Sequence, residues 1–444
     1  MSSSNTSYLT DLDVRVLVLA GGSSSRFMPL NKVFVDLGTG RTLIQQTFDR
    51  ACSTEIVDSK PLTARDKFYI ATGPDMASLM REQLPDIPPS NVISDPAPRN
   101  TLPAILWAIA NLQPTVSDDT LIAMLTGDHV IDNTQQFRKC VERALSVASL
   151  YDSIVTIGIT PSDDPNDWTS FGAMKEGMGC IQNLDASELE QFLEKPTKEM
   201  AEGMISEGGW FWNAGMFFFS IKSIEKGLSH TVPEVYEVYK QMKDLVSGPG
   251  IRRIGDAKKL FENFQRKIPH PLYPGTDRLA DNSIDYALMQ PLTNIPIDEI
   301  PPIRAYVIPG DFPWTDIGSW DALYKVVDPD DNDNIVVGTR LSLNNVRNCL
   351  ILGEESFQIS AYNCTDLVIV HSKEGVLFVC SKDYLGSKLR EVYTLFKSKE
   401  PLANLEFKSQ NCTLMGDNIV VVGCEGLAIE NGPDEAIVNV RNTM

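Results

Sequence analysis

The sequence predicts an α/β protein with a doubly wound, mostly parallel, Rossmann-like sheet, followed by a β-solenoid-like (β-helix) domain. Short β-rich runs alternate with helical stretches over roughly the first 130 residues, and strand-rich sequence follows from Ser153. Residues 335–444 are short β-rich segments punctuated by Asn, Gly and Cys. We therefore predict two domains, at residues 14–327 and 335–444.

The first part repeats a strand–helix unit. Its first strand is Val14–Leu19, a mostly apolar run that ends at Ala20-Gly21-Gly22, as expected of a buried parallel strand. Periodicity then predicts helix Thr42–Ala51, strand Phe68–Thr72, helix Met76–Gln83, strand Asn91–Ser94, helix Leu102–Leu112 and strand Thr120–Leu125. Ligands of such sheets bind beyond the carboxyl ends of the strands, where Gly21-Gly22 and Gly127-Asp128 follow their strands.

Strands dominate the next part. The predicted elements are strands Ile154–Ile159, Gly215–Ser220 and Ala305–Ile308, with helices Thr197–Glu207 and Val232–Val246. The acidic, polar stretch Asp328–Asn334 predicts a linker to the second domain.

The second domain contains a weak internal repeat. Asn348–Gly353 resembles Asn411–Gly416, 63 positions later, and Cys364–Ile369 resembles Cys424–Ile429, 60 positions later. A predicted helix, Tyr384–Phe396, separates the copies. Short strands recurring with small residues at corners indicate solenoid coils, with a β-sandwich as the alternative. Solenoid coils leave open edges, so we expect another subunit (a homo-oligomer through this domain) or the first domain to cover them.

Composition excludes several classes of protein. The chain has 444 residues, of which 43% are hydrophobic, enough for a large core. A net charge of −20 argues against nucleic acid as a partner, and no apolar run is long enough to span a membrane. Met1–Asp13 lacks the features of a signal peptide, and the eight cysteines form no CxxC pair, so we expect a cytoplasmic protein with reduced thiols.

The segment Leu19–Leu30 carries the strongest functional signal. Two glycines after a buried strand let successive backbone N–H groups face phosphate oxygens. Arg26 can hold two oxygens at once, and Lys32 adds a compact charge. A polar turn is the structural alternative, but Arg26, Pro29 and Lys32 favour a binding loop. Neither GxxxxGK[ST] nor a complete dinucleotide fingerprint is present.

This segment resembles the signature loop of the sugar-nucleotide pyrophosphorylases, and more specifically of the mannose-1-phosphate guanylyltransferases. The resemblance covers roughly residues 14 to 380. Its further blocks follow in family order: Lys32–Leu37, Thr42–Thr47, Pro96–Ile105, Gly127–Ile131, Phe192–Pro196, Trp212–Phe217, Ser283–Tyr286 and Trp314–Trp320.

The resemblance implies transfer of GMP from GTP to α-D-mannose 1-phosphate, giving GDP-mannose and pyrophosphate. A sugar phosphate is largely dianionic near neutrality, because its second pKa is about 6, so it needs no general base. Catalysis then consists of positioning and charge neutralisation at the α-phosphorus. A divalent cation, Mg²⁺ or another such as Mn²⁺, is the implied cofactor.

The resemblance also assigns residues to roles. The implied catalytic residues are Arg26, Lys32, Asp128 and Asp316, and the implied metal ligands are Asp128 and Asp316. The implied nucleotide-binding residues are Ala20, Gly21, Gly22, Arg26, Lys32, Asn100, Thr101, Gly127 and Asp128. The implied sugar-phosphate-binding residues are Gly172, Glu194, Lys195, Asn213 and Asp285. Without the resemblance, Asp128 and Asp316 are typical of turn residues, and Glu194-Lys195 is typical of a solvated ion pair. We interpret His129 as a structural histidine.

The chain departs from the family in two places. Only Asn31 stands between Leu30 and Lys32, where family members have several more residues. The segment from Lys397 shows no cupin-like isomerase module, so we predict no isomerase activity. The same reaction with another sugar or nucleotide, and a non-catalytic subunit that senses nucleotide sugars, are the alternatives; a nicotinamide dehydrogenase is a distant third.

Overall fold

The computed structural model describes residues 12–22, 24–56, 59–168, 170–248, 253–264, 267–269, 279–294, 302–338, 340–353, 357–385, 389–398 and 404–440. The chain divides into two compact units. The sheet unit comprises Met1–Gly22, Thr47–Gly127 and Ile131–Trp314, and the solenoid unit comprises Ser23–Gln46, Asp128–Val130 and Thr315–Met444. The domain boundaries drawn from the sequence stay a prediction.

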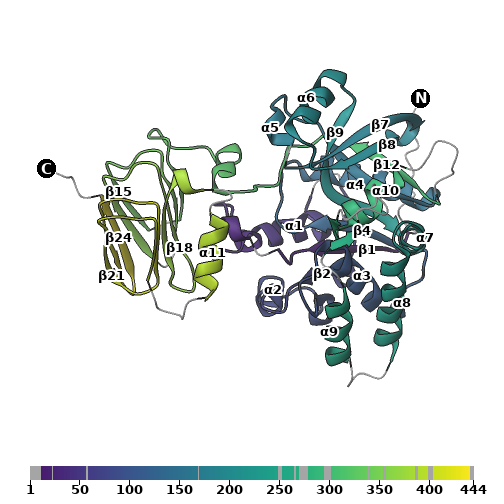
Figure 1. The fold of residues 1–444 in the computed structure, drawn as a ribbon, viewed down its shortest axis with the longest axis horizontal. Coiled ribbons are helices and arrows are strands. Elements are labelled where there is room, and N and C mark those ends of the chain that lie inside the picture. The colour runs from purple at the N-terminus through teal and green to yellow at the C-terminus, as the bar shows by residue number, and fades with distance from the viewer. Residues whose placement is uncertain are drawn as a thin grey trace. The chain divides into compact units, whose positions relative to one another are not determined.

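A nine-stranded sheet organises the sheet unit (Figure 1). Its order is β3 (Val92–Ser94), β2 (Phe68–Thr72), β1 (Val14–Leu19), β4 (Leu121–Thr126), β9 (Trp210–Ser220), β6 (Ser153–Ile159), β12 (Arg304–Pro309), β8 (Ala186–Glu194) and β7 (Gly172–Ile181). The first four strands are parallel, as are β6 and β12, whereas β9 runs antiparallel to β4 and β6. The predicted fold class is confirmed.

Helices cover both faces of this sheet. One apolar cluster joins alternate strand residues to α3 (Thr101–Leu112), α7 (Ile221–Thr231), α8 (Pro233–Ser247) and α9 (Arg253–Asn263). Helix α4 (Thr134–Leu150) contacts β4, β6 and β9 but contributes nothing to that cluster, which places it on the opposite face. The remaining helices and strands that lie wholly within the sheet unit are α2 (Ala77–Gln83), α5 (Pro165–Trp168), α6 (Lys198–Glu207), α10 (Gln290–Leu292), β10 (Lys267–Pro269) and β11 (Leu279–Asp281).

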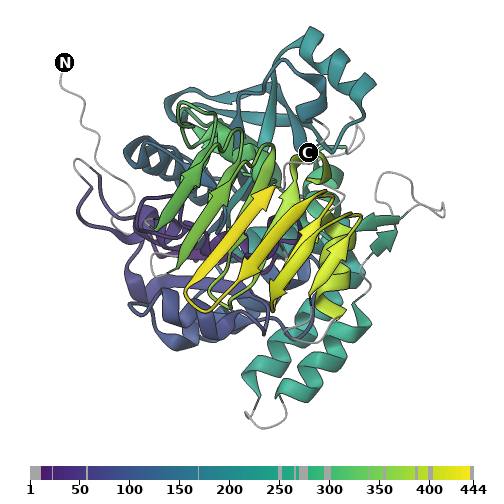
Figure 2. The ribbon, with the colours of Figure 1, turned by 90° about the vertical axis from the view of Figure 1, so that its left-hand side faces the viewer.

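Two further sheets make up the solenoid unit. The six-stranded sheet is β14 (Ile335–Val337), β16 (Leu350–Leu352), β18 (Leu367–His371), β19 (Leu377–Ser381), β22 (Ile419–Val422) and β20 (Leu405–Phe407). The five-stranded sheet, face on in Figure 2, is β15 (Leu341–Asn344), β17 (Gln358–Tyr362), β24 (Glu435–Val440), β23 (Leu427–Asn431) and β21 (Thr413–Gly416). Neighbouring strands are parallel except β18–β19 and β23–β24, as a solenoid with one reversal requires.

The internal repeat seen in the sequence is a repeat of solenoid corners. Isolated parallel bridges join Arg347 to Thr365 and Gln410 to Glu425, and the members of the two bridges stand 63 and 60 positions apart, like the sequence copies. Asn348 and Asn411, which correspond in the repeat, both have left-handed backbones, with φ of 46° and 55°. Asparagine tolerates that region better than most residues, which explains its recurrence at the corners.

Two apolar cores hold the solenoid unit together. The inner core lies between the two sheets and includes Ile359, Val421 and Val438. The outer core lies on the other face of the six-stranded sheet, where it packs against α11 (Leu389–Ser398) and against segments from residues 27–43 and 317–327. Subunit contacts through the open edges of the solenoid, and a cytoplasmic location, stay predictions.

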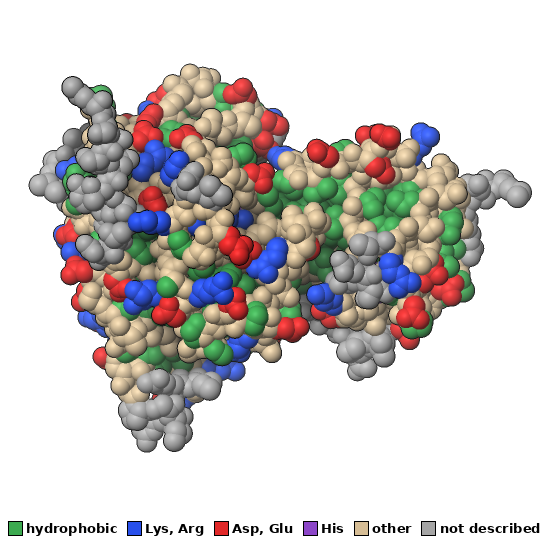
Figure 3. Space-filling model, turned by 180° about the vertical axis from the view of Figure 1, so that it is seen from behind, with side chains coloured by type: hydrophobic (Ala, Val, Ile, Leu, Met, Phe, Trp, Pro, Cys, Tyr) green, Lys and Arg blue, Asp and Glu red, His purple; other side chains and the backbone are tan. Residues whose placement is uncertain are grey.

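The surface charges and the helices can be compared with the features expected of nucleic-acid-binding and membrane-spanning proteins. On the face in Figure 3, acidic and basic side chains are interspersed, and no single basic field is visible. Among the described residues, no helix combines the length and apolar content needed to cross a membrane.

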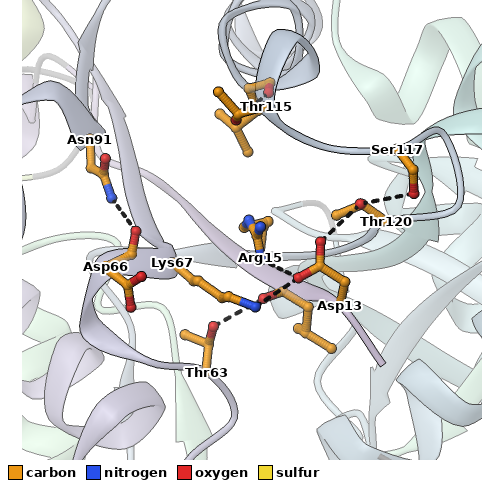
Figure 4. A network of polar contacts seen from close by, with 11 residues as sticks. Asp13, Arg15, Thr63, Asp66, Lys67, Asn91, Thr115, Ser117 and Thr120 are labelled. Atoms are coloured by element: carbon orange, nitrogen blue, oxygen red, sulfur yellow. Dashed lines mark hydrogen bonds and ion pairs between the residues drawn. The ribbon is translucent and has the colours of Figure 1, made fainter. Parts of the chain in front are cut away.

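A polar network at the amino end of β1 fixes the central strands (Figure 4). The carboxylate of Asp13 accepts hydrogen bonds from Arg15, from Lys67 Nζ at 2.8 Å and from the Thr120 hydroxyl at 3.1 Å. Its backbone carbonyl accepts from the Leu121 N–H at 3.0 Å. Asp13 therefore joins β1, β4 and the start of β2 at the edge opposite Gly21-Gly22.

We expect Asp13→Asn to lower the free energy of unfolding at pH 7 by roughly 0.5–1 kcal/mol, a modest value because solvent screens the partly exposed carboxylate. Burial alone would raise the pKa of Asp13, but Lys67 and Arg15 outweigh it and leave the pKa below its ordinary value. A lowered pKa gives stability that is present above the unfolded-state pKa and is lost as pH falls through the folded-state pKa.

Denaturant titration at pH 7 and near pH 4 measures this effect. The difference between wild type and Asp13→Asn should shrink at the lower pH. Asp119→Asn is the control, because Asp119 pairs with Lys222 on the exposed surface. An Asp13→Asn effect no larger than that of Asp119→Asn would contradict the assignment.

Candidate functional site

A cluster in the solenoid unit brings Lys32 to two acidic residues. Lys32 Nζ lies 2.9 Å from Oδ2 of Asp128 and donates to the backbone carbonyl of Asp316. The lysine is only 7% exposed. Burial of Asp128 favours its neutral form, but Lys32 and His129 outweigh burial and hold the pKa of Asp128 below its ordinary value. Asp128 is therefore ionised at neutral pH.

Arg26 lies at the same cluster and is exposed. A Cβ placed on Gly318 would lie 3.3 Å from Nη1 of Arg26 and 3.5 Å from Oδ2 of Asp316, so a glycine leaves room for both side chains. All four residues that the resemblance implies to be catalytic thus converge in one unit. Their roles stay a proposal.

Side chains within the loop Ser24–Phe34 close this loop by hydrogen bonds to one another and to its backbone. Asn31 accepts a hydrogen bond from the Ser24 hydroxyl at 3.1 Å and caps the short helix Lys32–Phe34 by accepting from the Val33 N–H. Ser24 has a left-handed backbone, with φ of 46°. These contacts close the turn that carries Arg26 and begin the short helix that carries Lys32.

The cluster suits an oxygen-bound cation that arrives with a phosphate. Within the part of the chain that the structure describes, no three His, Cys, Asp or Glu side chains gather as a metal site. Mg²⁺, however, is commonly held by one or two carboxylates, with substrate phosphates and water completing its octahedron. The carboxylates of Asp128 and Asp316 fit that donor set.

The predicted nucleotide residues of the sheet unit line the carboxyl ends of its parallel strands. Gly21 and Gly22 are exposed beyond β1, while Gly127 is buried after β4 and donates its N–H to Leu19. Asn100 has a φ of 79° and caps α3 by accepting from the Thr101 N–H at 2.8 Å. Ala20 is buried and donates to Ala71, which ties the end of β1 to β2.

The predicted sugar-side residues form a second cluster, also within the sheet unit. Nδ2 of Asn213 donates to Oδ1 of Asp285 at 2.9 Å, and Nζ of Lys195 lies 3.5 Å from Oε1 of Glu194. A Cβ on Gly172 would meet Oε2 of Glu194 at 2.8 Å, so the glycine is needed for this approach. The structure thus brings all five predicted residues together.

Burial sets the charge of the sugar-side acids. It raises the pKa of Glu194 to about 8, with the charge of Asp285 adding to the rise and Lys195 opposing it. Burial also raises the pKa of Asp285. Asp285 begins a π-helical turn, Asp285–Met289, a geometry often found at functional sites. Gln290 and Thr156 support the cluster by bonding the Glu194 N–H and the Asn213 side chain.

Sequence reasoning missed Asp95. This residue follows β3 and donates its N–H to Thr72 at the end of β2, so it lies on the same strand edge as Gly21. Its Oδ1 is buried and accepts no hydrogen bond from any described residue. Burial raises the pKa of Asp95 to about 7. The available signal was an acidic residue directly after a buried parallel strand.

The comparisons agree with this architecture. The nucleotidyl transferase family model matches residues 15–332. A mannose-1-phosphate guanylyltransferase of Klebsiella pneumoniae is 28% identical over 370 residues, covering 81% of this chain and 69% of that protein. The alginate biosynthesis protein AlgA of Pseudomonas putida is 28% identical over 389 residues, covering 85% and 71%.

A solved structure supports the fold. The protein of Thermus thermophilus described as a mannose-1-phosphate geranyltransferase superposes with a TM-score of 0.65 at 23% identity, covering 87% of this chain and all of that one. The family model spans well over half of the sequence, including both predicted carboxylate positions, 128 and 316. The chain belongs to the nucleotidyl transferase family.

Proposed function

We propose that the protein transfers GMP from GTP to α-D-mannose 1-phosphate and releases pyrophosphate. The observation that carries this proposal is the convergence of Lys32, Asp128 and Asp316 with the exposed guanidinium of Arg26. The names of the relatives supply the nucleotide and the sugar.

Charge neutralisation is the chemistry that this cluster offers. Arg26 and Lys32 hold the β- and γ-phosphates and offset the charge of departing pyrophosphate. Asp128 and Asp316 would hold the Mg²⁺, which when bound supplies positive charge at the α-phosphate. Because the sugar phosphate is already an anion, no residue has to remove a proton from it.

The sugar-side cluster supplies orientation. The carboxylate of Glu194 accepts hydrogen bonds from two sugar hydroxyls, and the exposed ammonium of Lys195 meets the sugar phosphate. Asn213, held by Thr156 and Asp285, presents an amide whose orientation is fixed. Positioning of this kind is a large part of the rate enhancement in reactions that join two substrates.

Asp95 is proposed to select guanine. A carboxylate can accept from both N1–H and the exocyclic amino group of guanine, whereas adenine offers no such pair of donors. A buried acceptor left unpaired penalises the wrong base, which is why such a residue discriminates strongly.

We expect Asp128→Asn to lower the rate of pyrophosphate release from GTP and mannose 1-phosphate by at least about 100-fold, because it removes a charge used at the reacting phosphates. Asp311→Asn, which alters an exposed aspartate, is the matched control. Wild-type protein that binds GDP-mannose but releases no pyrophosphate with any nucleotide–sugar pair would instead identify a sensor.

At about pH 9, where Glu194 is ionised, we expect Glu194→Gln to raise KM for mannose 1-phosphate about 10-fold while KM for GTP stays within about twofold, since each lost hydrogen bond to a charged group costs roughly 1.5–3 kcal/mol. In wild type, that KM should fall as pH rises through about 8, because the raised pKa of Glu194 keeps it protonated below this value. Glu190→Gln, on the exposed side of β8, should keep the same pH profile as wild type.

We expect Asp95→Asn to lower kcat/KM for GTP about 100-fold and to lower it much less for ITP, which lacks the exocyclic amino group. The measurement is the GTP-to-ITP ratio of kcat/KM, compared with that of Asp75→Asn, an exposed aspartate in the loop after β2. An unchanged ratio in Asp95→Asn would remove Asp95 from base selection.

A further inference from the structure

We call Arg26, Lys32, Asp128 and Asp316 the phosphate cluster. Each of these residues has a near neighbour in the chain that packs in or against one apolar core. That core is the outer core of the solenoid unit. Phe27 follows Arg26, and Ile317 follows Asp316; both side chains are buried there. The same core receives Val35, three residues after Lys32, and contacts Val130, two residues after Asp128.

The turn that carries Arg26 packs against an aromatic side chain and against a helix. The ring centroids of Phe27 and Trp320 lie 4.5 Å apart, and Trp320 is fully buried. Helix α11 packs on the turn Ser25–Phe27, and Figure 1 shows the helix beside this purple segment. Val392 of α11 is fully buried in the outer core.

The contacts beside Asp316 hold a strained backbone. Ile317 has a φ of 38°, a left-handed conformation that is a genuine outlier for a β-branched residue. Its side chain is fully buried in the outer core. Such strain persists only where the surroundings impose it, and here it accompanies the carbonyl of Asp316 that Lys32 contacts.

We propose that packing against the solenoid holds the phosphate cluster in place. Trp320 and Val392 are the positioning residues that set the placement of Arg26 and Asp316. This inference rests on the proposed function for its kinetic readout. The solenoid strands and α11 touch no reacting group in this scheme. They act through the buried side chains of Phe27 and Ile317, which follow the two functional residues in the chain.

Two valine variants test the proposal. Val392 lies in the outer core and Val438 in the inner core, and both are fully buried. Val392→Ala and Val438→Ala remove the same two methyl groups, and both should lower Tm. Only Val392→Ala should weaken GTP binding in Mg²⁺ and lower kcat, each about 10-fold, because small displacements of positioned groups reduce rates strongly. KM for mannose 1-phosphate should change less than about twofold in both.

A double-mutant cycle separates positioning from general destabilisation. If Val392 acts through Arg26, Val392→Ala should cost little further activity in an Arg26→Lys background, so the two effects are not additive. Equal losses in Val392→Ala and Val438→Ala, or full additivity with Arg26→Lys, would overturn the proposal. Should Val392→Ala fail to fold, Trp320→Phe, which keeps an aromatic ring beside Phe27, takes its place.

The two proposals fail in different ways. Wild-type protein that binds GTP but releases no pyrophosphate contradicts the proposed function alone. GTP affinity, measured by calorimetry in Val392→Ala and Val438→Ala, then decides the role of the solenoid without any turnover. Equal GTP affinities in the two variants would contradict the proposal that the solenoid positions the phosphate cluster.

Discussion

The ion pair between the Lys32 ammonium and the carboxylate of Asp128, joined by the contact of Lys32 with the backbone carbonyl of Asp316, is the interaction on which the proposed phosphate cluster depends. Two unit charges about 4 Å apart interact by about 4 kcal/mol at an effective dielectric constant of 20. In the proposed reaction, two carboxylates and a triphosphate would repel one another at that scale without Lys32. The chain as a whole carries a net charge of −20, so the balancing cations have to be local. Arg26 and Lys32 meet this requirement in a single short loop, which Ser24 and Asn31 close.

Much of the sheet could be predicted because its strands are buried on both faces. Strands such as Val14–Leu19 and Leu121–Thr126 are therefore continuous apolar runs, which periodicity detects. Strands β7 and β8 escaped prediction because they are antiparallel and half exposed, with Lys175 and Glu176 inside β7. Glu194, at the end of β8, was therefore placed by family resemblance and not by its surroundings.

The geometry of the candidate site lay beyond the sequence for a physical reason. Lys32 and Asp128 are 96 positions apart, and nothing local to either residue indicates the other. Asp95 was missed because its signature is burial without a partner, which depends on how β2, β3 and α3 pack. In the same way, the four residues of the cluster were expected in a nucleotide-binding domain, yet by their contacts they group with the C-terminal strands.

The strain at Ile317 makes energetic sense only if the solenoid core is intact. A non-glycine residue in a sparsely populated backbone region costs of order 1–3 kcal/mol. Full burial of an isoleucine side chain stabilises the folded state by roughly 1.5–3 kcal/mol, which is similar in size to this cost. Ile317 is fully buried, so packing against the outer core can offset the strain beside Asp316. Loosening that core would let the backbone relax toward a common conformation, and the carbonyl that Lys32 contacts would move with it. In our proposal, the solenoid strands and α11 therefore bear on phosphate chemistry through the outer core that buries Phe27 and Ile317, with no side chain of these elements at the reacting atoms.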